Sequence, residues 1–143
     1  MLPRLIVVDR RNRQLDFYRW RLTTGRYFLA ATYTVTVGRV GARTPHGLYF
    51  VQGRSRTPDW MVPESPDYAP ETWGTIYKFG EPGNPFDGGF VSLSGDESGI
   101  GIHGTVFDPQ IGTASSHGCI RMLTGDFLEI YSKCKNGTPV YLH

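Results

Sequence analysis

The segment SSHGCIRM, residues 115–122, brings a cysteine, a histidine, a glycine and an arginine together within eight positions. A second histidine lies upstream, in the segment GIGIHGT, residues 99–105. A free cysteine has a pKa of about 8.5, and only its thiolate is a good nucleophile. A histidine held near the sulfur can act as a base or as a cationic partner. The two segments therefore contain a candidate nucleophile and candidate bases.

Gly118 directly precedes the cysteine and allows a sharp backbone bend. Such a bend can direct the N–H groups of Gly118 and Cys119 toward a substrate oxygen, as in an oxyanion hole. We expect the hydroxyl of Ser116 to support this turn. Residue chemistry alone leaves a structural cysteine as the alternative, because a cysteine near a histidine is not by itself a catalytic signature.

Longer motifs around these residues resemble a known family. The segments IHGT, residues 102–105, and SHGCIRM, residues 116–122, resemble the signature of the L,D-transpeptidase catalytic domain, the YkuD-like family. The segment TPHG, residues 44–47, resembles the turn of that family that follows a strand ending in Val-Gly, and GTPV, residues 137–140, resembles its closing strand. The similarity runs from about residue 6 to residue 142, so we expect residues 1–143 to form a single catalytic domain.

The resemblance implies a role for both histidines. It places the nucleophile at Cys119 and implies that His103 contacts the sulfur while the carbonyl of Gly104 orients the ring. A carbonyl that accepts from one ring nitrogen fixes the tautomer and leaves the other nitrogen for the thiol. The alternative for His103 is a histidine packed in the core. His117 is expected to be structural or part of the oxyanion region, with direct proton transfer as its alternative.

Arg121 matches the Cys-Ile-Arg-Met version of the family motif. Its guanidinium can hold a substrate carboxylate in a bidentate contact, and an ion pair with a local acid is the alternative. His46, in the segment TPHG, is expected to be a turn residue only.

The resemblance also implies an activity. The enzyme would cleave a peptidoglycan tetrapeptide stem between the L-centre of a diamino acid and the following D-alanine. The acyl group would form a thioester on Cys119 and pass to the amine of another stem, which gives a 3→3 crosslink. With water as acceptor the protein would be an L,D-carboxypeptidase, and without turnover it would be a cell-wall-binding module.

Partners and location follow from the same resemblance. It implies acylation by carbapenem-type β-lactams, an extracytoplasmic location in the periplasm or cell wall, and no metal or organic cofactor. A zinc site would have to combine Cys119, Cys134 and the histidines near them, and these residues lack C-x-x-C spacing. The N-terminus does not have the pattern of a signal peptide, and no apolar run approaches the roughly 20 residues of a membrane span.

Composition favours a folded β protein. The chain has 143 residues, with 39% hydrophobic and 20% charged residues, which argues against disorder. Its 18 glycines and 10 prolines favour a turn-rich β protein over a helical bundle. At this length one domain buries roughly two-thirds of its unfolded surface, and we expect a monomer.

The net charge of +2 is unevenly distributed. Residues 1–56 carry eleven arginines against two aspartates, whereas residues 59–97 carry eight acids against one lysine. This pattern indicates solvated strands and complementary surfaces within one fold, or a basic face directed at an anionic polymer such as a cell wall. Nucleic acid is not expected, because no Lys/Arg run is interleaved with aromatic residues in a known binding module.

Periodicity predicts a mainly β sandwich or barrel with one helix packed near the C-terminus. The strands are expected at residues 5–9, 15–20, 28–37, 48–52, 90–93, 100–103 and 138–142. Thr124 is the predicted N-cap of the helix, whose apolar spacing continues to Cys134, with Gly137 as the stop. We expect Cys134 to be buried rather than bridged to Cys119. The resemblance implies the same fold, with the cysteine at the end of a strand before the helix.

Residues 54–89 form the irregular part of the chain, with six prolines and six aromatic residues. Loops of this length inside compact domains are uncommon and often functional. Aromatic rings on such a loop could form a wall of a substrate cleft, and Trp60 and Tyr77 are the candidates for substrate contacts. The alternative is a satellite core under the loop. Residues 75–79 could form a short strand.

Overall fold

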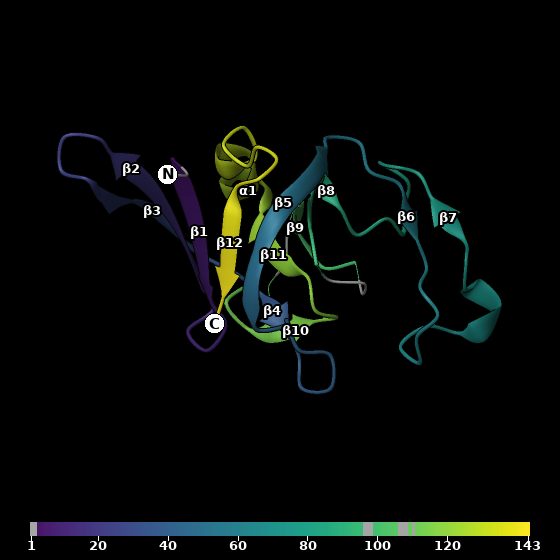
Figure 1. Ribbon diagram of the computed structural model, residues 1–143. Coiled ribbons are helices and arrows are strands. Elements are labelled where there is room, and N and C mark those ends of the chain that lie inside the picture. Colours follow the sequence, from purple (N-terminus) through teal and green to yellow (C-terminus); the bar gives the residue numbers. More distant parts are fainter. Residues whose placement is uncertain (1–2, 96–98, 106–108, 110) are drawn as a thin grey trace.

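The computed structural model describes residues 3–95, 99–105, 109 and 111–143. Within these ranges the chain forms mostly strands, with one α-helix and one short 3-10 helix (Figure 1). The elements in chain order are β1 (Arg4–Asp9), β2 (Gln14–Arg21), β3 (Arg26–Thr34), β4 (Val37–Gly38), β5 (Gly47–Ser55), β6 (Trp60–Met61), η1 (Pro70–Thr72), β7 (Ile76–Tyr77), β8 (Asp87–Leu93), β9 (Gly101–Thr105), β10 (Ala114–Ser116), β11 (Ile120–Leu123), α1 (Thr124–Tyr131) and β12 (Pro139–Leu142).

Eight strands form the main sheet, in the order β11-β9-β8-β5-β12-β1-β2-β3. The first half of β5 pairs with β12 and its second half with β8, with a register shift between Val51 and Gly53. The sheet bends at β5. One buried hydrophobic cluster contains side chains from the strands on both sides of β5 and from α1. The predicted mainly β, sandwich-like fold with one packed helix is confirmed, and the described strands do not close into a barrel.

Most of the predicted strands are confirmed, with ends shifted by at most three residues. The strand predicted at residues 28–37 is instead split, because β3 ends at Thr34 and β4 pairs with β10. Between them, the N–H and carbonyl of Thr36 bond to the backbone of Arg121 at 2.9 Å. The chain thus leaves β2 to join the strands around the cysteine, and this change of partner is not visible in the alternation. The short strand predicted at residues 75–79 is present as β7.

The helix is shorter than its apolar spacing predicts. It ends at Tyr131, although Cys134 beyond it is still completely buried. Gly137 lies in the turn before β12 with φ of 86°, so it does not terminate the helix. Thr124 is the first helical residue rather than the N-cap, and its hydroxyl donates to Asp87 Oδ2 at 2.5 Å.

A strand, rather than the helix itself, follows the cysteine. Ile120 and Met122 of β11 are completely buried and alternate with the half-buried Arg121 and exposed Leu123. Four residues are too few for this alternation to predict a strand from the sequence alone. The sequence also predicts a polar connection at residues 94–98 and a loop at residues 108–115. The loop ends in β10, and residues 96–98, 108 and 110 of the two segments lie outside the described residues. In the described part of the chain, no helix is long and apolar enough to cross a membrane.

Phe127 should be one of the main energetic contributors to this fold, because its side chain is completely buried between α1 and the sheet. We expect Phe127→Ala to lower the free energy of unfolding by about 3–5 kcal/mol, measured by chemical denaturation. Leu128→Ala, at a neighbouring position that is 38% exposed, is the matched control and should cost less than about 1 kcal/mol. Equal losses in the two variants would contradict the assignment of the buried face of α1.

Candidate active site

The register between two strands brings the candidate residues to the same wall of a cavity. Strands β9 and β11 are parallel neighbours, and His103 lies opposite Arg121. Cys119 directly precedes β11, and its side chain lines the same cavity as those of His103 and Arg121. Ile120 and Ile102 point the other way and are completely buried. The pairing of two strands, rather than closeness in sequence, therefore brings the cysteine near His103.

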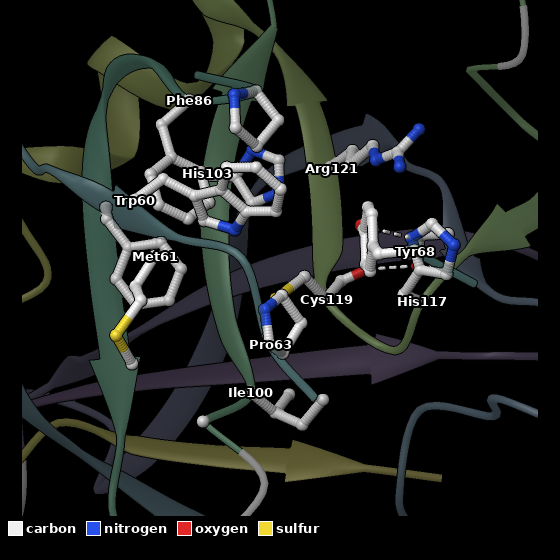
Figure 2. Close-up of a pocket in the computed structure, with 14 residues that line it drawn as sticks. Trp60, Met61, Pro63, Tyr68, Phe86, Ile100, His103, His117, Cys119 and Arg121 are labelled. Atoms are coloured by element: carbon white, nitrogen blue, oxygen red, sulfur yellow. Dashed lines mark hydrogen bonds between the residues drawn. The ribbon is translucent and has the colours of Figure 1, made fainter. Parts of the chain in front are cut away.

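These side chains line a cavity of about 400 Å3 (Figure 2). The wall opposite the cysteine comes mainly from the long loop between β5 and β8, which contributes Trp60, Met61, Pro63, Tyr68, Pro85 and Phe86. Trp60 thus lines the cavity, as the sequence analysis predicts for a substrate-contacting residue. Tyr77 is not among the lining residues, because it stacks on Trp60 at 5.9 Å between ring centroids and pairs with it across β6 and β7. Tyr77 therefore supports Trp60 from outside the cavity.

His103 is almost completely buried and its ring is held on several sides. Its Nδ1 lies 3.1 Å from the carbonyl oxygen of Gly104, the contact that the resemblance implies. Since a carbonyl can only accept, Nδ1 carries the proton in this contact, and Nε2 is the acceptor of the neutral ring. The rings of Phe86 and Phe90 lie 4.8 and 6.2 Å from the imidazole between centroids. These contacts give His103 one tautomer and one orientation.

The turn before the cysteine is held from inside by Ser116, which is completely buried. Its hydroxyl donates to the carbonyl oxygen of Cys119 at 2.6 Å and accepts from the N–H of Gly118 at 3.2 Å. The Gly118 amide thus has a partner within the turn. The oxyanion role of the Gly118 and Cys119 amides stays a prediction.

Position 118 requires glycine because of its backbone conformation and because a side chain would not fit there. Its φ of 120° lies in the region that favours glycine, and a Cβ here would stand 2.6 Å from Cδ1 of Ile100. A second hydroxyl holds the same residue from the other side. Thr44, also buried, donates to the carbonyl oxygen of Gly118 at 2.7 Å and accepts from the N–H of Gly38 at 2.9 Å. The sequence analysis assigned Thr44 to a turn motif and missed this contact, because no local pattern indicates a hydrogen bond to a residue so distant in the sequence.

His117 points away from His103 and toward the long loop (Figure 2). Its Nδ1 lies 3.3 Å from the hydroxyl of Tyr68 and its Nε2 lies 3.6 Å from Oδ2 of Asp67. Asp67 also forms an ion pair with Arg39. His117 thus connects the catalytic turn to the loop, which agrees with a structural role more than with proton transfer.

Tyr68 is a residue of the cavity that sequence reasoning missed. Burial raises the pKa of its hydroxyl, and the charges of Asp67 and Cys119 raise the pKa further, whereas Arg121 lowers it. The phenol is therefore neutral at physiological pH and lies within electrostatic reach of both Cys119 and Arg121. One tyrosine among six aromatic residues in an aperiodic loop gave no signal that could single it out.

Arg121 lies at the rim of the cavity, and its guanidinium extends away from Trp60 in Figure 2. Both cysteines are free thiols, so no bridge joins Cys119 to Cys134. Burial raises the pKa of Cys134 to about 12, so this thiol stays protonated at neutral pH. Among the residues that the structure describes, no group of three or more His, Cys, Asp or Glu side chains could hold a metal ion.

Removing the hydroxyl of Thr44 should disturb the catalytic turn. In Thr44→Val the buried N–H of Gly38 and carbonyl of Gly118 lose this partner, and an unsatisfied buried group costs about 1–3 kcal/mol. We expect a loss of this size in the free energy of unfolding, together with slower alkylation of Cys119 by a thiol reagent. Thr24→Val, at an exposed turn, is the control and should change stability by less than about 0.5 kcal/mol. Wild-type stability and alkylation of Thr44→Val would show that this hydroxyl does not hold the turn.

Comparison with known proteins agrees with the sequence motifs. The family model of the L,D-transpeptidase catalytic domain, YkuD, matches residues 3–142. The chain is 32% identical over 139 residues to "Putative L,D-transpeptidase YkuD" of Bacillus licheniformis and 33% identical over 112 residues to the protein of that name in Bacillus subtilis. These matches cover 97% and 78% of the chain, and the chain spans only 65% and 52% of the length of the two relatives.

Solved structures show the same fold at lower sequence identity. The L,D-transpeptidase LdtMt1 in complex with imipenem superimposes with a TM-score of 0.72 at 17% identity, over 99% of this chain and 59% of that one. The catalytic domain of the E. faecium L,D-transpeptidase gives 0.67 at 24% identity, over 100% of this chain and 98% of that one. By its family match, the chain belongs to the L,D-transpeptidase catalytic domain (YkuD) family.

Proposed function

We propose that residues 1–143 act as one L,D-transpeptidase catalytic domain that forms 3→3 crosslinks in peptidoglycan through a thioester on Cys119. The observation that carries the proposal is that Cys119 and His103 line the same wall of the cavity. The contact of Nδ1 with the Gly104 carbonyl leaves Nε2 of His103 as the nitrogen that can accept a proton. Family membership supports the reaction class.

The first half-reaction forms the acyl-enzyme. Nε2 of His103 takes the proton of the Cys119 thiol, and the sulfur attacks the carbonyl carbon that precedes the terminal D-alanine of the donor stem. The C–N bond breaks, the leaving amine takes the proton from His103, and a thioester remains. In this scheme the backbone N–H of Cys119 donates to the oxyanion of the tetrahedral intermediate.

The second half-reaction transfers the acyl group. The side-chain amine of another stem attacks the thioester carbon and gives its proton to His103, which returns it to the departing sulfur of Cys119. The rings of Trp60, Phe86 and Phe90 form an apolar lining around the reacting atoms. Such a lining strengthens the electrostatic contacts inside the cavity and reduces competition from water, which favours an amine acceptor.

Two alternatives share part of this scheme. An L,D-carboxypeptidase would use water as acceptor with the same residues, so only the product distinguishes it. A cell-wall-binding module would need no nucleophile, and the intact Cys119 and oriented His103 argue against it. The solved relative with imipenem and a Mycobacterium tuberculosis relative with a faropenem-derived adduct support the expectation that carbapenem-type β-lactams acylate this site. An extracytoplasmic location follows if peptidoglycan is the substrate.

The products of the reaction test this proposal directly. We expect purified tetrapeptide muropeptides incubated with the protein to give dimers by mass analysis, whereas Cys119→Ala should give none. Loss of alanine without dimers would identify the carboxypeptidase instead. If the folded wild-type protein leaves the muropeptides unchanged, the catalytic proposal fails.

Acylation by a carbapenem should identify the nucleophile. The intact protein should gain one adduct mass, Cys119→Ala should gain none, and Cys134→Ala should react as the wild type does. The reason is that burial keeps Cys134 protonated, with a pKa of about 12, and inaccessible. An adduct on Cys134 in the folded protein would contradict the assignment.

Arg121 should contribute to the binding of a substrate carboxylate at the cavity rim. Hydrogen bonds to charged groups contribute about 1.5–3 kcal/mol, so Arg121→Ala should lower kcat/KM roughly ten- to hundredfold with little change in melting temperature. Arg121→Lys should recover only part of the loss, because an ammonium cannot reproduce the planar fork. Arg26→Ala, at an exposed position in β3, is the control and should have wild-type kinetics. An Arg121→Ala protein that melts several degrees earlier yet turns over normally would mark Arg121 as structural.

A further inference from the structure

Tyr68 presents a hydroxyl to the catalytic cavity that neither half-reaction uses. Its side chain lines the cavity together with Cys119 and His103. In Figure 2, His103 lies on the Trp60 side of Cys119, and Tyr68 lies on the side of His117. The hydroxyl is therefore placed to contact a molecule that approaches an acyl group on the sulfur from the His117 side.

Contacts on several sides hold Tyr68 in place. Its backbone N–H donates to the carbonyl oxygen of Ser65 at 3.0 Å, and its own carbonyl accepts from Nε1 of Trp73 at 3.1 Å. Its ring packs edge-on against Trp60, with 5.6 Å between ring centroids, and lies 5.4 Å from the His117 ring. The hydroxyl therefore has a defined position before any substrate binds.

A carboxylate sets the direction of the hydrogen bond between Tyr68 and His117. Oδ2 of Asp67 lies 3.6 Å from Nε2 of His117, and Asp67 is itself held by its ion pair with Arg39. This carboxylate would repel a lone pair on Nε2, so the neutral ring carries its proton on Nε2. Nδ1 is then an acceptor, and the Tyr68 hydroxyl, 3.3 Å away, donates to it.

The phenol oxygen of Tyr68 is consequently available to accept a hydrogen bond from the cavity. Its own proton is directed at His117, and the structure gives this hydroxyl no other hydrogen-bond partner among the described residues. Burial raises the pKa of Tyr68, and the charges of Asp67 and Cys119 raise it further. The phenol therefore keeps its proton and offers a neutral oxygen.

Strong acceptors are scarce among the described side chains that line the cavity. Many of them are apolar, the hydroxyl of Ser116 is engaged inside the turn, and Arg121 can only donate. Nε2 of His103 and the oxygen of Tyr68 are the two acceptors near the cysteine. An N–H group that enters such a lining without an acceptor costs free energy, so an incoming amine needs both atoms.

We propose that Tyr68 binds the amine of the acceptor stem and aligns it for attack on the thioester, a role that rests on the proposed transpeptidase function. Asp67 and His117 are positioning residues, because they direct the phenol proton away from the cavity and leave the oxygen as an acceptor. Tyr68 keeps its own proton throughout and contributes orientation only.

The hydrogen atoms of the amine are all accounted for in this step. A neutral primary amine has one lone pair and two N–H groups. The lone pair forms the C–N bond at the thioester carbon while one N–H donates to the oxygen of Tyr68. The other proton passes to Nε2 of His103, the C–S bond breaks, and His103 returns the proton to the sulfur of Cys119.

Water depends less on Tyr68 than the amine does. A water molecule that loses this contact can turn toward neighbouring water, because it is small and the cavity is open to solvent at its rim. The amine of a bound stem is held by the rest of the peptide against an apolar lining and has no such replacement. Removal of the phenol oxygen should therefore slow transfer to an amine more than it slows hydrolysis.

The test measures the two half-reactions separately in the full chain. The donor is a stem tetrapeptide with its side-chain amine acetylated, so that it cannot be an acceptor, and the acceptor is a stem tripeptide with a free amine. The first turnover of released D-alanine reports acylation, and the ratio of crosslinked to hydrolysed product by mass reports transfer. We expect Tyr68→Phe to keep the acylation rate within about twofold and to lower the ratio about three- to tenfold, the effect of one lost hydrogen bond between neutral groups.

Tyr18→Phe is the matched control, because it removes the same hydroxyl from β2, outside the cavity lining. It should leave the acylation rate and the product ratio unchanged. A role of Tyr68 in packing alone would slow both half-reactions together or leave both as they are. Either result for Tyr68→Phe would overturn the proposal.

The tautomer of His117 gives a second test that uses the wild-type protein. Imidazole nitrogen shifts measured by NMR, at a pH where the ring is neutral, should place the proton on Nε2. A proton on Nδ1 would mean that the phenol proton of Tyr68 points into the cavity. That result would contradict the proposal even if Tyr68→Phe failed to fold.

The products also separate this role of Tyr68 from the function on which it rests. If the wild type releases no D-alanine from the donor, both proposals fail. If it releases D-alanine but forms hydrolysed product only, the cysteine chemistry stands and the acceptor role of Tyr68 fails. If crosslinked product forms in the same ratio in the wild type and in Tyr68→Phe, the transpeptidase function stands and only the role of Tyr68 fails.

Discussion

The fixed turn at residues 116–119 is the constraint on which the site depends. The buried hydroxyls of Ser116 and Thr44 hold it from two sides, and Gly118 adopts a conformation that a side chain would prevent. The chain leaves this turn as β11, whose pairing with β9 sets His103 beside the cysteine. Because these hydrogen bonds are buried, water competes little for them, and the sulfur and imidazole keep their positions without a ligand.

The opposite wall of the cavity depends on weaker contacts to the same turn. The ion pairs of Asp67 with Arg39 and His117 are partly exposed, and such pairs contribute at most about 1 kcal/mol. Ring contacts add to them, because Tyr68 packs 5.6 Å from Trp60 and 5.4 Å from the His117 ring. The cavity therefore combines one wall held by buried hydrogen bonds, which carries Cys119 and His103, with a second wall held by partly exposed contacts.

The candidate site was largely predictable from sequence because its key residues lie in short local motifs, such as the three residues before Cys119. What the sequence could not show was non-local or aperiodic. Tyr68 reaches the site through the fold of an irregular loop, which has no periodicity to interpret. The four residues of β11 were too few to predict a strand directly before the clear helical pattern of α1. Cys134 extended the apolar spacing beyond the helix, because burial in the core does not require helical conformation.

The uneven charge distribution is partly explained by contacts within the fold. The pair between Arg39 and Asp67 joins the basic N-terminal part to the acidic loop, so part of the asymmetry is complementarity within one fold. That explanation does not extend to Arg11 and Arg43, whose exposed side chains pair with none of the described residues. Arg13 is half-buried, and its φ of 54° is a backbone conformation that residues other than glycine rarely adopt. The charge asymmetry therefore combines an ion pair within one fold with solvated arginines on the surface.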